Sequence, residues 1–153
     1  MTKTNAAAQE TVSFCPSAQP DWRDSVAIGI MGGTAEQPRM AHLGGTLPVT
    51  EHLLTLSGPV APTEVFRFAA PCMQGQCAHF QNSSCGLVTQ IVTLLPTVAD
   101  TLPSCVIRPR CRWWLQSGKA ACFRCAQVVT DNYNPTPEMR IASTPLTMTN
   151  SSA

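Results

Sequence analysis

The sequence predicts an α+β fold: a small single domain with a short N-terminal hairpin or sheet, followed by three or four helices around a cysteine-ligated metal region. Apolar, β-branched runs closed by glycine pairs come early in the chain, and segments with helical signals come later. Seven of the eight cysteines lie between Cys72 and Cys125, among those helical segments. A chain of 153 residues has room for one domain of this kind.

Both ends of the chain are polar and lack a periodic apolar pattern. We therefore expect a flexible leader over residues 1–22, a cysteine-rich metal-binding domain over residues 23–133 and a disordered tail over residues 134–153.

The predicted strands lie in the first half of the chain. The run SVAIGIMGG, closed by Gly32 and Gly33, predicts a strand and a turn, and RMAHLGGTLPV predicts the strand that returns beside it. The alternating segment TEVFRFAAP predicts a further strand, which leads the chain to Cys72. Between them, PVTEHLLTLSG predicts a two-turn helix with Thr50 as its N-cap.

Three further helices are predicted in the cysteine-rich part. The segment NSSCGLVTQIVTLLP predicts a buried helix that begins at Cys85, with Ser83 or Ser84 as its cap and Pro96 as its end. The segments CRWWLQSG and KAACFRCAQVV predict two more helices, separated by Gly118.

The net charge of +1 conceals a basic segment. Residues 1–100 hold four basic and seven acidic side chains, a net charge of −3, whereas residues 101–130 hold five basic side chains and no acidic one. The sequence pI of about 7.6 and the lack of an aromatic-interleaved sheet motif make nucleic acid a less favoured partner. The glycine-rich turns lack the lysine of a P-loop, and no arrangement of nucleophile, histidine and acid predicts a hydrolase.

The cysteines predict metal binding in a reducing compartment. The amino end has no apolar core of a secretory signal, and no apolar run is long enough to span a membrane, so a cytoplasmic location is expected. Clustered cysteines in the cytosol more often bind metal than form structural disulfides. A secreted protein that pairs all eight cysteines remains an alternative and requires an export route.

The spacing of the candidate ligands divides them into two groups of four, the number that a tetrahedral site needs. The first cysteine group reads C-x4-C-x-H-x5-C, and the second cysteine group reads C-x5-C-x10-C-x2-C. The predicted metal ligands are Cys72, Cys77, His79 and Cys85 in the first group, and Cys105, Cys111, Cys122 and Cys125 in the second. His79 is included because imidazole is a frequent fourth ligand.

Large apolar residues near the second group and the local positive charge favour an iron–sulfur cluster, since both suit an anionic, water-excluded centre. The expected cofactor is a 4Fe-4S cluster, in one or two copies, with zinc as the alternative. A dithiol redox function for CFRC is disfavoured, because the segment before it does not have the pattern of a strand.

These features predict a small cytoplasmic iron–sulfur protein that acts in electron transfer or redox sensing, without independent catalytic activity. The alternative is a zinc-stabilised module that interacts with protein or nucleic acid. The expected partner is a redox or regulatory protein, and its predicted contacts are Arg108, Arg110 and Arg112.

Overall fold

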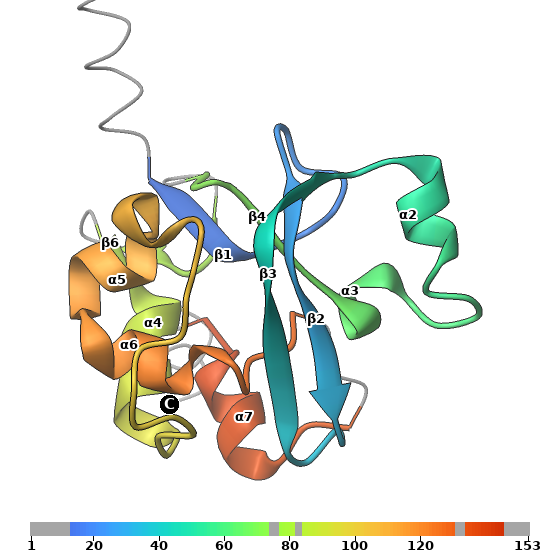
Figure 1. Ribbon diagram of the computed structural model, residues 1–153. Coiled ribbons are helices and arrows are strands. Elements are labelled where there is room, and N and C mark those ends of the chain that lie inside the picture. The colour runs from blue at the N-terminus through green and yellow to red at the C-terminus, as the bar shows by residue number, and fades with distance from the viewer. Residues whose placement is uncertain (1–12, 74–76, 82–83, 131–133, 146–153) are drawn as a thin grey trace, which may run out of the picture.

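The computed structural model describes residues 13–73, 77–81, 84–130 and 134–145 (Figure 1). Its main element is a four-stranded antiparallel sheet with the order β1-β4-β2-β3. The strands are β1 (Phe14–Ala18), β2 (Val26–Gly33), β3 (Pro38–Pro48) and β4 (Phe66–Pro71).

The hairpin of β2 and β3 confirms the first strand prediction. Gly33 ends β2 with a φ of 75°, a conformation that glycine adopts without a steric penalty. The turn is closed by Thr34, whose hydroxyl accepts from the backbone N–H of Gln37 at 3.0 Å. The strand predicted before Cys72 is also confirmed, as β4.

The described part of the chain also contains six short α-helices, a two-stranded sheet and a 3-10 turn, η2 (Arg108–Arg110). The small sheet pairs β5 (Phe80–Gln81) with β6 (Ser84–Cys85). The helices are α2 (Glu51–Thr55), α3 (Pro62–Val65), α4 (Gly86–Leu94), α5 (Arg112–Ser117), α6 (Lys119–Cys125) and α7 (Pro137–Ala142).

Local signals set several helix ends as predicted. The hydroxyl of Thr50 accepts from the backbone N–H of Leu53 at 3.1 Å and caps α2. Gly118, with a φ of 63°, separates α5 from α6. The serine cap predicted for α4 is wrong at Ser84, which lies in β6 and donates its hydroxyl to the carbonyl of Gln81; Ser83 lies outside the described residues.

The two faces of the main sheet are covered by different helices (Figure 1). Phe66, Phe68 and Ala70 of β4 belong to a core cluster that includes Leu53 of α2. Ala69 belongs to the other cluster, which is built mainly on α4 to α7. Because both faces are covered, residues 66–70 are all buried.

The predicted fold class is wrong in its architecture. The sheet is larger than a hairpin, because β4 inserts between β1 and β2 after two intervening helices. There are also more helices than predicted, because α3 occupies the start of the segment predicted as a strand before Cys72 and α7 lies in the predicted tail. The predicted metal region is not preformed either: among the described residues, no three His, Cys, Asp or Glu side chains are placed to hold a metal ion.

Strand β1 lies inside the predicted leader, and α7 lies inside the predicted tail, so both segments contribute regular structure. Residues 1–12 and 146–153 lie outside the described residues. The division of the chain at residues 23–133 stays a prediction. No helix in the described ranges is both long enough and apolar enough to cross a membrane.

Candidate functional site

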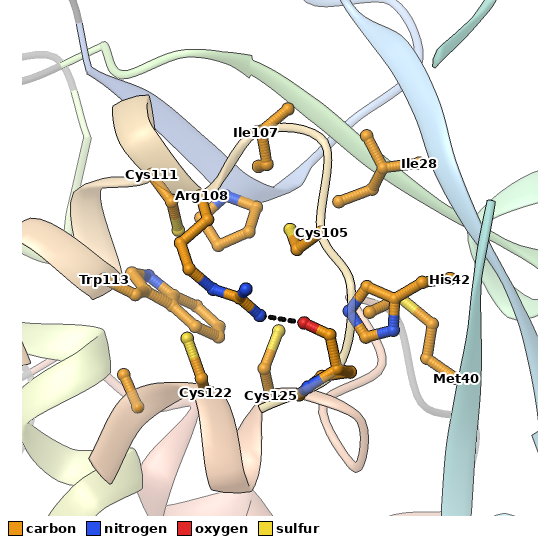
Figure 2. A pocket seen from close by; sticks show the side chains of 13 residues that line it. Ile28, Met40, His42, Cys105, Ile107, Arg108, Cys111, Trp113, Cys122 and Cys125 are labelled. Carbon is orange, nitrogen blue, oxygen red and sulfur yellow. Dashed lines mark hydrogen bonds between the residues drawn. The ribbon is translucent and has the colours of Figure 1, made fainter. Parts of the chain in front are cut away.

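The second cysteine group converges on one pocket (Figure 2). Cys105 lies in the loop before η2, and Cys111 is the N-cap of α5 and forms a β-bridge with Phe14. Cys122 and Cys125 are one turn apart on α6, so that both side chains reach the same side of the helix. The pocket that these four cysteines line has a volume of about 20 Å³.

Most other walls of this pocket are apolar and come from the sheet and from the loop before α5. Trp113 forms one wall and is only 1% exposed. His42 of β3 also lines the pocket, and burial lowers its pKa, as do the nearby positive charges of Arg67 and Arg108. The remaining lining residues are Pro16, Ile28, Met40, Pro103, Ile107 and Ala121.

The guanidinium of Arg108 reaches into the space beside the sulfur atoms (Figure 2). It donates to the carbonyl of Pro103 and lies 5.6 Å from the ring centre of Trp114. Its Nε is buried and has no hydrogen-bond partner among the described residues. A hydrogen bond from Arg108 lowers the pKa of Cys122, although burial has the larger effect and leaves that pKa raised.

Arg67 brings a second positive charge to the same group from β4. Its side chain is 0% exposed and donates to the Sγ of Cys125 at 3.2 Å. It also donates to the carbonyls of Pro16, Cys125 (2.8 Å) and Val128 (2.9 Å). Within the described part of the chain, the acceptors of this buried guanidinium are carbonyl and sulfur atoms and not carboxylates.

Burial favours the protonated thiols of Cys105 and Cys111. It raises the pKa of Cys111 to about 12 and raises the pKa of Cys105 as well. Each thiol adds to the effect on its neighbours, because a second thiolate close by would be repelled. A metal ion reverses this preference, since thiolates bind it with loss of their protons.

A second pocket, of about 330 Å³, brings together Cys15, Cys72, Cys77 and Cys85, which we call the Cys15 set. The pKa of Cys15 is raised to about 12, mainly by burial and to a smaller extent by the other three cysteines of the set. Trp113 lines this pocket as well as the pocket of the second cysteine group. The other lining residues include Trp22, Met73, His79, Phe80 and Arg112.

Gln116 of α5 holds the backbone at Cys85. Its side-chain Oε1 accepts from the N–H of Cys85 at 2.8 Å, and its Nε2 donates to the carbonyl of Cys85 at 2.9 Å. The backbone N–H and carbonyl of Cys85 are therefore both held by α5, and these bonds orient the start of α4 relative to α5.

The structure thus keeps the predicted second group together but changes the composition of the first. His79 lines the pocket of the Cys15 set, and burial lowers its pKa. Its buried Nδ1 has no hydrogen-bond partner in the part of the chain that the structure describes. Sequence reasoning missed Cys15 and Arg67. The total of eight cysteines, two complete sets of four, was a signal for Cys15; a charge within an apolar strand was a signal for Arg67.

The three arginines predicted to contact a partner do not share one exposed face. Arg110 is exposed, whereas Arg108 reaches the second cysteine group. Arg112 lies over the ring of Phe80, 5.3 Å from its centre, and its buried Nε finds no hydrogen-bond partner within the described ranges.

Comparison with known proteins identifies no relative of this chain. It matches no protein-family model, no curated protein and no solved structure. The function of the protein is therefore inferred from its own residues and their arrangement.

Proposed function

We propose that this protein binds an iron–sulfur cluster through Cys105, Cys111, Cys122 and Cys125 and uses it in electron transfer or redox sensing in the cytoplasm. One observation carries the proposal: four thiols from a loop, a helix N-cap and a second helix line a single, largely apolar pocket. Four thiolates are the usual ligand set of a 4Fe-4S cluster, which is the form we favour.

The donor set fits such a centre in type and number, but the sulfur atoms are not yet in metal-binding positions. Loading therefore requires the side chain of Arg108 to leave the space beside the sulfur atoms. Cys105 lies on a loop held by the bond from Arg108 to Pro103, so the same movement frees this ligand to shift toward Cys122 and Cys125.

The charges of the pocket also support the proposal. Arg67 is fully buried and donates to the sulfur of Cys125, and Arg108 lies beside Cys122. A buried cation is costly unless an opposite charge is close. Four thiolates around a cluster supply that negative charge, and the N–H donors of Arg67 would then form charge-assisted hydrogen bonds to sulfur.

When bound, an iron–sulfur cluster supplies a one-electron couple. The apolar walls formed by Ile28, Ile107 and Trp113 exclude water from the pocket. The positive charges of Arg67 and Arg108 favour the more negative, reduced state. In this role the protein takes one electron from a reduced protein partner and passes it to an oxidised one, without transfer of atoms.

The protein purified without oxygen is expected to be brown, with broad visible absorption and with iron and acid-labile sulfide in equal amounts. In the double variant C122S/C125S, the amount of iron bound at this site should fall at least about tenfold, because two of the four ligands are removed. Absorption spectra and elemental analysis of the same samples measure both effects.

The matched double variant C72S/C77S, with the same change in the other pocket, should keep the cluster of the second cysteine group. A colourless protein that carries zinc would contradict the iron–sulfur proposal and support a zinc-stabilised module.

A further inference from the structure

We infer that the Cys15 set is a second metal site, in which Cys15, Cys72, Cys77 and Cys85 bind a soft divalent metal ion such as Zn²⁺. This inference stands on a different pocket from the proposed function and does not depend on it. Cys15 of β1, and not His79, is the fourth ligand.

Strand pairing brings the first two ligands together. Cys15 lies opposite Ala70 in the register of β1 and β4, and the ladder continues with the N–H of Cys72 donating to the carbonyl of Ser13 at 2.8 Å. Cys15 and Cys72 are therefore diagonal neighbours across the two strands, a relation with a typical separation of about 7–8 Å between Cα atoms.

The small hairpin brings the other two ligands. The carbonyl of Cys77 accepts from the N–H of Phe80 at 3.1 Å, so Cys77 lies one turn before β5. Phe80 is paired with Cys85, and Gln116 holds Cys85 on both backbone groups. All four sulfur-bearing side chains line the same 330 Å³ pocket, but no three of them are placed to hold one ion, so metal loading would have to draw them together.

Two residues that line this pocket have a buried nitrogen atom without a hydrogen-bond partner among the described residues, the Nε of Arg112 and the Nδ1 of His79. The contact of Arg112 with Phe80 supplies no negative charge to its guanidinium. A tetrathiolate metal centre carries two negative charges and sulfur acceptors, which would satisfy the donor of Arg112.

Metal loading of the set balances as a simple exchange. Four S–H bonds break, four bonds form between sulfur and Zn²⁺, and four protons leave to the solvent, with no change in oxidation state. Because Cys15 belongs to β1 and the other three ligands to residues 72–85, the ion would tie the edge strand of the sheet to the start of α4.

Titration of the full chain with Co²⁺, as a coloured probe for Zn²⁺, tests this site. We use a variant in which all four cysteines of the second group are serine, so that a tetrathiolate centre must contain Cys15. It is expected to bind one Co²⁺ with the intense thiolate-to-metal absorption of four sulfur ligands, and to release it to Zn²⁺. A spectrum with fewer sulfur ligands, or no binding, would overturn the inference.

Single substitutions in the otherwise wild-type chain give a second test. C15S and C72S should each bind one Co²⁺ fewer than the wild-type chain, whereas H79A should bind as many as the wild-type chain. Circular dichroism verifies that each variant is folded. A C15S variant that binds as much Co²⁺ as the wild-type chain, or an H79A variant that binds one fewer, would overturn the assignment of Cys15 as the fourth ligand. Failure of the iron–sulfur proposal would leave these differences unchanged, because the second cysteine group is the same in all four proteins.

Discussion

Replacement of Arg67 by methionine is expected to lower the free energy of unfolding by about 3–5 kcal/mol, because one buried and two partly buried carbonyls lose their donor and each unsatisfied buried group costs about 1–3 kcal/mol. The carbonyls are those of Pro16, Cys125 and Val128, which belong to β1, to the end of α6 and to the segment after it. Arg67 therefore connects the sheet to the cysteine-bearing helix. Chemical denaturation monitored by circular dichroism measures the loss.

The control for this prediction is R110M, because Arg110 is exposed. Its effect should remain within about 0.5 kcal/mol, as is usual for surface substitutions. R67K keeps the charge but not the forked donor geometry, so its loss should lie between those of R110M and R67M. If R67M were as stable as R110M, the bonds of Arg67 would not stabilise the contact between the sheet and α6.

Replacement of Trp113 by alanine is also expected to cost about 3–5 kcal/mol, the range for truncation of a large aromatic residue in a core. Trp113 is 1% exposed and lines both cysteine pockets, and the guanidinium of Arg67 lies 5.4 Å from its ring centre. The variant should therefore weaken metal binding at both sites as well as the fold. Denaturation and metal titration of the same preparation measure the two effects.

A conservative variant separates packing from hydrogen bonding at this position. The indole N–H of Trp113 has no hydrogen-bond partner in the part of the chain that the structure describes, so W113F loses volume but no hydrogen bond. W113F should be clearly more stable than W113A. L115A changes a residue that is 61% exposed on the same helix and should have an effect below about 0.5 kcal/mol. Equal losses in W113F and W113A would contradict the packing explanation.

The elements that the sequence predicts correctly are those defined by neighbouring residues. Gly33 ends β2, Thr50 caps α2, and Gly118 separates α5 from α6, and each acts within one or two turns of chain. The position of β4 between β1 and β2 is different, because it depends on pairing between distant strands. Local patterns carry no information on that pairing, so the predicted sheet was too small.

The same distinction applies to the candidate site. The second cysteine group lies within one short segment, and spacing alone placed its four members together. Cys15 joins the other set only through the pairing of β1 with β4, which spacing does not reveal. Arg67 lies at a polar position of an alternating segment, a pattern typical of a strand with one face in solvent. Both faces of β4 are covered, however, so the charge of Arg67 is buried.

Native mass spectrometry of the protein, purified without oxygen, tests most directly whether the eight cysteines form two sets of four metal ligands. The mass of the intact complex identifies each bound metal or cluster, and the number of protons displaced reports the thiolates that bind it. We predict two centres per chain, with an iron–sulfur cluster in the second cysteine group and a divalent ion in the Cys15 set. A chain that carries no metal, or that is lighter by two hydrogens for each pair of cysteines, would contradict this account and indicate free thiols or disulfides.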